Sequence, residues 1–264
     1  MHALLLLTLT VTLVRGFIDL PGPSVPCKVR LASTEPVDKS RIDHFSTDHS
    51  QTQYHGDFLH PLAAAAEQML GELGFPNRTL GSFRTKVANS RHRRSQRKKY
   101  PVVIFSPALH ASRIAYTEIL TAVASQGFVV VSIDHPYDSM VVEFPTGRVI
   151  YAVDIEDSEV PLTLDVRVKD VIFTLDQMHS NSDFIPYTFR RYLNLNRVAA
   201  IGHSFGGATA AQVTQNDTRF AGGLNFDGNL YGPVVKTGLN KPFINFGAEA
   251  PSIGISAGAS AGTV

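Results

Sequence analysis

The sequence predicts an α/β protein with a doubly wound, mostly parallel β-sheet. Three observations lead to this expectation: apolar runs rich in β-branched residues, helical patterns between those runs, and a Gly-x-Ser-x-Gly segment at the end of one run. Parallel strands are buried on both faces by the helices that join them, which accounts for such apolar runs. The 264 residues are 44% hydrophobic and 18% charged, which is enough for one large core.

The expected elements alternate along the chain. Buried strands are expected at residues 100–106, 128–134, 193–201, 220–227 and 242–247. Helices are expected at residues 61–70, 114–125 and 162–178. In the last helix the apolar residues are spaced so that most can share one face: Leu164, Val166, Val168, Val171, Ile172 and Leu175. A small hairpin is expected from residues 140–144 and 148–152.

The strand that ends at Ile201 leads into a nucleophile elbow. Residues 202–206 read Gly-His-Ser-Phe-Gly, and an alanine-rich helix follows. Ser204 is expected to stand above the sheet at a helix N-terminus, where free N–H groups favour a developing negative charge. The alternative is a glycine-rich turn with an incidental serine, but the strand before it and the helix after it favour the elbow. The predicted fold class is therefore an α/β hydrolase.

A serine nucleophile needs a base and an acid, and it also needs an oxyanion hole. Asp227 ends the strand after the elbow helix and is the expected acid, although Asp227-Gly228-Asn229 also has the composition of a simple turn. Phe205 follows the serine and supplies one N–H. The second donor is expected after the strand 100–106, where Pro107 has no N–H and Ala108 or Leu109 must serve.

The N-terminus indicates secretion. Residues 1–16 contain an apolar run too short to span a membrane, and we expect a signal peptide cleaved before Phe17, with a buried first strand as the alternative. No later stretch is long enough for a membrane anchor. Cys27 is the single cysteine, so no intrachain disulfide is possible. Asn77 and Asn216 begin glycosylation sequons, and a secreted, extracellular glycoprotein is predicted.

The charge distribution argues against nucleic-acid binding, because the net charge is only +1. Residues 91–99 contain six of the 24 Lys and Arg and are expected to form an exposed loop, with contact to anionic lipid or proteolytic processing as alternatives. No metal site is expected. The histidines of the preceding polar region match no standard ligand spacing: His44, His49, His55 and His60.

From about Pro21 to Gly247 the chain resembles the secreted platelet-activating-factor acetylhydrolase-like lipases, especially their fungal-type branch. The segments that carry the resemblance are residues 38–43, 105–109, 134–138, 142–145, 202–207 and 227–228. The resemblance implies a calcium-independent, cofactor-free carboxylesterase of the 1-alkyl-2-acetylglycerophosphocholine esterase type. It would remove short or oxidised sn-2 acyl chains from phospholipids, with Ser204 as nucleophile, Asp227 as acid and the N–H groups of Leu109 and Phe205 as oxyanion hole.

The sequence also departs from this family. Members carry glycines around the oxyanion leucine where this chain has Ala108 and His110, so the loop is expected to take another path. The catalytic histidine should follow the strand after Asp227, but no histidine follows His203. The last strand and helix of the fold are expected to be missing. We therefore expect one incomplete α/β-hydrolase domain at residues 17–247 and an irregular tail at 248–264, from a truncated, mis-spliced or degenerate copy.

Three histidines are candidates for a substitute base. His110 and His135 follow core strands, whereas His203 lies within the elbow and is expected to point away from the serine. Loop histidines without a catalytic role are the simpler expectation. Two alternatives to the phospholipid esterase stay open: a non-catalytic secreted remnant that keeps a lipid-binding cleft, and a general short-chain or polyester esterase.

Overall fold

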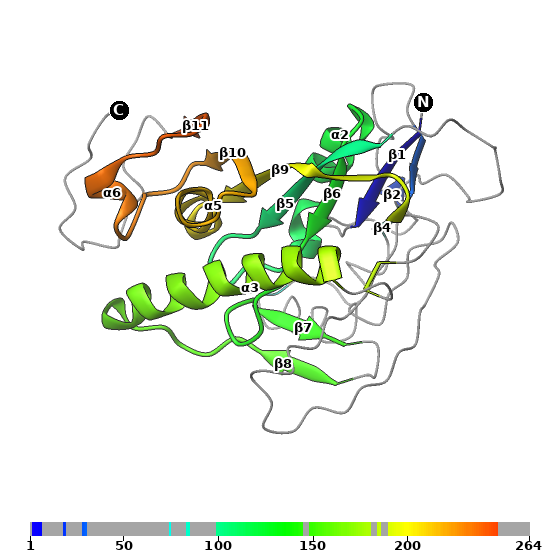
Figure 1. The fold of residues 1–264 in the computed structure, drawn as a ribbon. Coiled ribbons are helices and arrows are strands. Elements are labelled where there is room, and N and C mark those ends of the chain that lie inside the picture. Colours follow the sequence, from blue (N-terminus) through cyan, green and yellow to red (C-terminus); the bar gives the residue numbers. More distant parts are fainter. Residues whose placement is uncertain are drawn as a thin grey trace.

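A seven-stranded sheet with the order β11-β10-β9-β5-β6-β1-β3 forms the centre of the protein, and every pair in it is parallel (Figure 1). The structure is a computed structural model that describes residues 2–6, 18–19, 28–30, 74, 83–84, 99–144, 148–180, 184–185 and 190–247. The strands of the sheet are β1 (His2–Leu6), β3 (Lys28–Arg30), β5 (Tyr100–Ser106), β6 (Val129–Ser132), β9 (Leu193–His203), β10 (Phe220–Phe226) and β11 (Phe243–Phe246).

The helices are α2 (Thr117–Ser125), α3 (Val160–Ser180), α5 (Phe205–Asn216) and the short α6 (Val234–Thr237), with 3-10 turns η3 (Arg113–Tyr116) and η4 (Asp157–Glu159). Two small sheets complete the description: β2 (Ile18–Asp19) pairs with β4 (Phe83–Arg84), and β7 (Val141–Glu143) pairs antiparallel with β8 (Val149–Tyr151).

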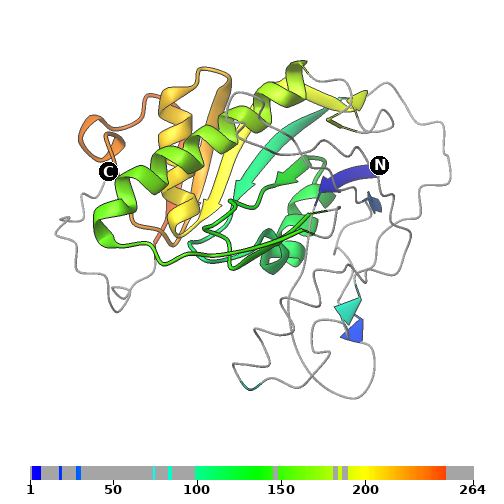
Figure 2. The ribbon, with the colours of Figure 1, turned by 90° about the horizontal axis from the view of Figure 1, so that it is seen from below.

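Helices cover both faces of the sheet, and the alternation of side chains along β5 shows how. Val102 and Ile104 belong to the core cluster that includes residues of α3 and α5, whereas Val103 and Phe105 pack with residues of α2. Successive side chains of a strand point to opposite faces, so this alternation separates two helical layers. Figure 2 shows α3 and α5 crossing the same face of the sheet. Helix α5 is almost wholly buried, which explains its alanine-rich sequence.

The chain reverses its direction of travel across the sheet beside β5. From β5 it passes through α2 to β6 on one side, and then through α3 to β9 on the other side. The carboxyl ends of β5 and β9 therefore lie at the point where open α/β sheets form their binding crevices. This point carries both Ser106 and the Ser204 turn.

The structure confirms most of the expected core elements. The strand at 100–106, the hairpin and the three strands after residue 190 are present, while the helix expected from residue 114 begins with the 3-10 turn η3. Of the predicted apolar face of α3, Val166 is 38% exposed, because only residues at helical spacing from Leu164 reach the sheet. None of the helices in the described ranges is long and apolar enough to cross a membrane.

Several predictions fall outside the described residues. These are the helix at 61–70, the histidine-rich region, the basic run up to residue 98, Asn77 and the tail at 248–264. Residues 2–6, inside the predicted signal peptide, form β1 between β6 and β3. Cleavage before Phe17 stays a prediction, and it would leave β6 without this neighbour.

Candidate active site

Ser204 occupies the turn between β9 and α5 by itself. Its backbone has φ 52° and ψ −121°, a conformation that residues other than glycine rarely adopt. The turn is fixed by the Ser204 N–H, which donates to the carbonyl oxygen of Phe226 at 2.8 Å. The side chain is partly exposed, and its Oγ makes no hydrogen bond to any residue that the structure describes. This is the geometry of a nucleophile elbow.

Two glycines make the turn possible through close backbone contacts. A Cβ on Gly202 would lie 1.9 Å from the carbonyl oxygen of Gly206, and a Cβ on Gly206 would lie 2.0 Å from that of Ser106. Neither position has room for a side chain. The close approach of Gly206 also brings the loop after β5 directly against the start of α5.

The loop after β5 leaves one of the two candidate N–H groups available. The N–H of Ala108 donates to the Tyr116 hydroxyl at 3.1 Å, so this donor is already used. The N–H groups of Leu109 and Phe205, by contrast, have no acceptor among the described residues. Of the two sequence candidates in this loop, Leu109 is therefore the one with a free donor.

The backbone of His110 shows how the loop after β5 folds without the glycines found at this place in the family. His110 has φ 59°, in the left-handed region that glycine adopts without cost, whereas Ala108 has no positive φ. Two hydrogen bonds stabilise His110 there: its N–H donates to Asp138 Oδ1 at 3.3 Å, and its carbonyl oxygen accepts the N–H of Met140 at 3.2 Å. The loop thus takes a glycine-like turn with a histidine.

Asp227 lies at the same edge of the sheet as Ser204. It directly follows β10, has φ 51°, and is exposed. The next residue packs against the elbow, since a Cβ on Gly228 would lie 2.1 Å from the Ser204 carbonyl oxygen. Buried Asn225 supports this turn through Nδ2, which donates to the Gly228 carbonyl oxygen at 2.6 Å. The structure therefore brings Asp227 and Ser204 onto neighbouring strand ends.

His203 does not contact Ser204 through a hydrogen bond. Its Nδ1 lies 2.8 Å from the hydroxyl of Tyr116, whose oxygen accepts the Ala108 N–H. The Tyr116 hydroxyl thus links the elbow histidine to the loop after β5. Burial lowers the pKa of His203 below its ordinary value of 6.5, and the charge of Asp227 acts in the opposite direction.

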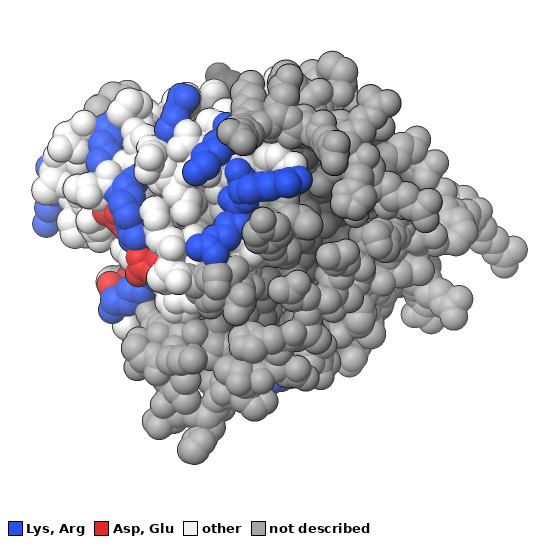
Figure 3. Space-filling view, turned by 45° about the vertical axis from the view of Figure 1, so that its right-hand side comes forward, with Lys and Arg blue, Asp and Glu red and all other residues white. Residues whose placement is uncertain are grey.

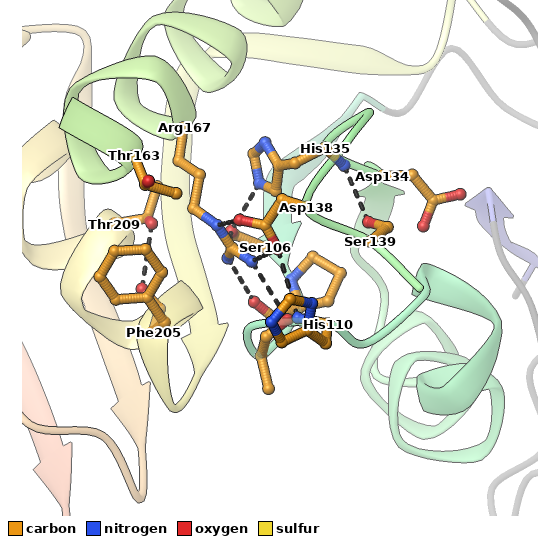
Figure 4. Close-up of polar contacts among 12 residues, drawn as sticks. Ser106, His110, Asp134, His135, Asp138, Ser139, Thr163, Arg167, Phe205 and Thr209 are labelled. Carbon is orange, nitrogen blue, oxygen red and sulfur yellow. Dashed lines mark hydrogen bonds and ion pairs between the residues drawn. The ribbon is translucent and has the colours of Figure 1, made fainter. Parts of the chain in front are cut away.

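His135 is part of a Ser–His–Asp arrangement that the sequence did not reveal, and Figure 4 shows its ring beside Ser106. Its Nε2 lies 2.9 Å from Ser106 Oγ and its Nδ1 lies 2.8 Å from Asp170 Oδ2. An ionised carboxylate can only accept, so Nδ1 is the donor to Asp170. Both ring nitrogens are used, and the ring is 1% exposed. His135 is thus unavailable to Ser204.

Arg167 is the other residue that sequence reasoning missed. It lies within the buried face of α3 and is 0% exposed, and its guanidinium pairs with Asp138 (Figure 4). A signal was present, because position 167 has helical spacing from Leu164 and Val171 on the predicted apolar face. A charged residue at such a position requires a buried partner.

No described histidine is hydrogen bonded to Ser204 Oγ, so the structure does not bring the substitute bases to the nucleophile. Within the described ranges, no three His, Cys, Asp or Glu side chains are grouped to bind a metal ion.

Comparisons with known proteins show the family of this chain. The family profile described as platelet-activating factor acetylhydrolase, isoform II matches residues 55–150 and 165–242. The chain belongs to this family. A probable 1-alkyl-2-acetylglycerophosphocholine esterase of Arthroderma benhamiae is 35% identical over 156 residues, which are 56% of this chain and 38% of that protein. The platelet-activating factor acetylhydrolase of Bos taurus is 30% identical over 195 residues, which are 62% of this chain and 44% of that protein.

A solved structure supports the fold. The ferulic acid esterase from Streptomyces cinnamoneus matches with a TM-score of 0.57 and 31% identity, over 70% of this chain and 52% of that one. Together with the parallel sheet and the helices on both faces, this confirms the predicted α/β-hydrolase fold. The chain spans less than half the length of the two acetylhydrolase-type relatives named above.

Proposed function

We propose that this chain is a serine carboxylesterase of the 1-alkyl-2-acetylglycerophosphocholine esterase type. The observation that supports this most is the state of Ser204: it has a positive φ, and among the described residues neither its Oγ nor the N–H groups of the adjoining Leu109 and Phe205 have a hydrogen-bond partner. The names of the relatives support ester substrates, and those of the acetylhydrolases support short sn-2 acyl groups of phospholipids.

The proposed reaction proceeds through an acyl-enzyme. Ser204 Oγ bonds to the carbonyl carbon, and the oxygen of the tetrahedral intermediate accepts hydrogen bonds from Leu109 and Phe205. The bond to the sn-2 oxygen then breaks, and that oxygen leaves with the proton that the base took from Ser204. Water releases the acyl group in the reverse sequence. Asp227 is proposed as the acid that orients the base, and we assign the base to none of the described residues.

A specific observation favours a second candidate, a non-catalytic secreted protein that keeps the lipid-binding cleft. Ser204 has no histidine partner among the described residues, and the triad of serine hydrolases acts as a unit. We therefore expect weak or no turnover from this sequence. The structural similarity to a ferulic acid esterase also supports a general short-chain esterase, which would use the same chemistry as the first candidate on a different ester.

The proposed setting is extracellular, with peripheral contact to lipid surfaces. On the described part of one face, lysine and arginine side chains predominate over acidic ones (Figure 3). Such a face favours anionic surfaces through electrostatic attraction. Asn216 is exposed at the end of α5, which suits a glycosylation site.

The test compares the secreted chain with Ser204→Ala in two assays. Hydrolysis of a 2-thioacetyl phosphocholine ether measures turnover, and a fluorophosphonate probe measures covalent reactivity of the serine. Probe labelling that depends on Ser204, with slow thioester hydrolysis, supports the esterase. If neither occurs while vesicles of phosphatidylcholine still bind, the non-catalytic candidate replaces it. Hydrolysis of methyl ferulate and p-nitrophenyl acetate, but not of the phospholipid, would favour a general esterase.

The source of the base can be tested separately by reading the transcript beyond codon 247 to its stop. A reading frame that continues into a strand and helix with a histidine would supply the proposed base. In that case the longer protein should hydrolyse the thioester rapidly.

A further inference from the structure

The buried guanidinium of Arg167 has an unusual set of partners. Its Nε donates to Asp138 Oδ2 and its NH2 to Asp138 Oδ1, both at 2.5 Å, so the charge is paired in a two-point contact. The Asp138 side chain is 7% exposed, so water screens the pair little. Burying two charges has a large desolvation cost, and a neutral apolar pair would fill the same space. The remaining contacts of Arg167 indicate what this pair does.

The other guanidinium donors bind the backbone of the proposed oxyanion loop. NH1 donates to the carbonyl oxygen of Pro107 at 2.7 Å, and NH2 donates to that of Ala108 at 3.1 Å. NH1 also lies 3.4 Å from Ser106 Oγ. One side chain of α3 therefore binds three consecutive residues at the end of β5.

The contact with Ala108 sets the direction of the Leu109 N–H. The carbonyl of Ala108 and the N–H of Leu109 belong to one planar trans peptide, in which the two groups point in opposite directions. Because the carbonyl points to the guanidinium, the N–H of Leu109 points away from it. In the same way, Arg167 and the Tyr116 hydroxyl bind the two ends of the peptide between Pro107 and Ala108.

Arg167 also contacts the second proposed donor residue. Its Cζ lies 5.0 Å from the centroid of the Phe205 ring, within the distance of a cation–π contact. Phe205 is the first residue of α5 and supplies the N–H next to Ser204. A single buried guanidinium thus contacts the Phe205 ring and the carbonyl oxygen of the peptide whose N–H belongs to Leu109.

We propose that Arg167 is a positioning residue that fixes the Leu109 and Phe205 N–H groups in the geometry of the oxyanion hole, with Asp138 as its counter-ion. This inference rests on the proposed function of Ser204. Arg167 touches no substrate. It acts through the loop and the ring, and Asp138 adds to the effect through Oδ1, which also accepts the His110 N–H.

The experiment uses Arg167→Lys as its main variant. Lysine keeps the positive charge beside Asp138, but a single ammonium cannot reproduce the planar contact to Asp138 and two carbonyl oxygens. A second variant, Arg167→Met with Asp138→Asn, removes both charges and so avoids an unpaired buried ion. Lys169→Met is the matched control. It changes a residue of the same helix whose side chain is 57% exposed and pairs with Asp165.

Three readouts are combined. Hydrogen exchange of the peptide covering residues 107–112 should accelerate about tenfold or more in both variants, because the loop loses its buried partners. With the thioester substrate, kcat should fall about 100-fold with KM changed less than about threefold, since an oxyanion hole acts in the transition state. Binding of a trifluoromethyl ketone, which forms an oxyanion on Ser204, should weaken in parallel with kcat. The control should match the wild type in all three.

The outcomes separate this proposal from the proposed function. If the wild type neither hydrolyses the thioester nor reacts with a fluorophosphonate, the esterase assignment fails, and hydrogen exchange alone decides whether Arg167 orders the loop. Unchanged exchange in Arg167→Lys overturns the inference whatever the activity. The inference is also overturned if kcat falls while KM rises by the same factor and binding of the ketone is unchanged. If the double variant does not fold, as judged by circular dichroism, Arg167→Lys decides.

Discussion

Ser106 and Ser204 lie at the carboxyl ends of neighbouring parallel strands, and they differ in almost every property that matters for catalysis. Ser106 ends β5, pairs in register with Gly202 of β9, and has a histidine and an aspartate in the order of a catalytic triad. Ser204 follows β9 directly and has no such partners among the described residues. A search for Ser–His–Asp contacts alone would select Ser106 and not the proposed nucleophile, Ser204.

Access and backbone conformation distinguish the two serines. Ser106 is 2% exposed, and its Oγ is bonded to His135. Ser204 has positive φ, and its Oγ and two neighbouring N–H groups make no hydrogen bond within the part of the chain that the structure describes. A hydroxyl without room for an acyl group cannot attack one, however basic its histidine is. We propose from this comparison that the elbow and the proposed oxyanion donors indicate the reactive serine, and that the Ser106 arrangement is structural.

The strongest test of this comparison is covalent labelling. In Ser204→Ala the rate of reaction with a fluorophosphonate should fall at least about 10³-fold, because the nucleophile is removed. In Ser106→Ala the rate should fall less than about tenfold, since only one weak contact to Arg167 is lost near the oxyanion loop. Intact mass spectrometry of the labelled chain measures both. Loss of labelling in Ser106→Ala with retention in Ser204→Ala would reverse the assignment.

The second test concerns stability. His135→Ala should lower the free energy of unfolding by about 3–5 kcal/mol, because it opens a cavity and removes the imidazole that hydrogen bonds to the buried Ser106 hydroxyl and to the Asp170 carboxylate. Urea unfolding at pH 8 measures this effect. Ser106→Ala removes one hydroxyl and should cost about 1 kcal/mol.

His179→Ala provides the matched control for His135. His179 is exposed in the last turn of α3, and its replacement should change the free energy of unfolding by less than about 0.5 kcal/mol. Equal losses at the two histidines would show that the Ser106 arrangement does not support the fold.

The core of the fold could be predicted from sequence because it depends on local patterns. The run at 100–106 is apolar on both faces, and this is the signature of a strand buried between two helical layers. Ser204 was also predictable, because an elbow requires glycines at fixed spacing around the nucleophile. Arg167 was not identified, since its partners come from two loops whose paths are set only by tertiary contacts. The role of His135 was hidden for the same reason: its aspartate comes from α3, 35 residues later in the chain.

A smaller effect is expected at His110, where the oxyanion loop uses a histidine in the left-handed region. His110→Gly should be more stable than His110→Ala by about 1 kcal/mol, because alanine pays the steric cost of positive φ and glycine does not. Both substitutions remove the same imidazole, so the difference isolates the backbone. Urea midpoints of the two variants measure it. Equal midpoints would mean that the loop takes another path when His110 is replaced.

The smallest expected effect tests the electrostatic link between Asp227 and His203. Burial lowers the pKa of His203, so the unfolded chain binds a proton more readily than the folded one just below pH 6.5. The contribution of His203 to stability is therefore complete above pH 6.5 and is lost as the pH falls from there to the folded pKa. Its size is small, because the ring is partly exposed to solvent. His203→Gln should remove this part of the pH dependence.

Asp227→Asn tests the electrostatic contribution of the carboxylate by itself. The charge of Asp227 raises the pKa of His203, whereas burial lowers it. Without that charge the pKa should fall further, and the pH range over which stability is lost should extend to lower values. The NMR titration of the His203 Cε1 proton measures the pKa directly in both proteins. A rise of this pKa in Asp227→Asn would contradict the placement of the carboxylate at the Ser204 edge. A fall supports it, and shows that the exposed Asp227 carboxylate acts on an imidazole at the elbow, as the proposed triad acid must be able to do.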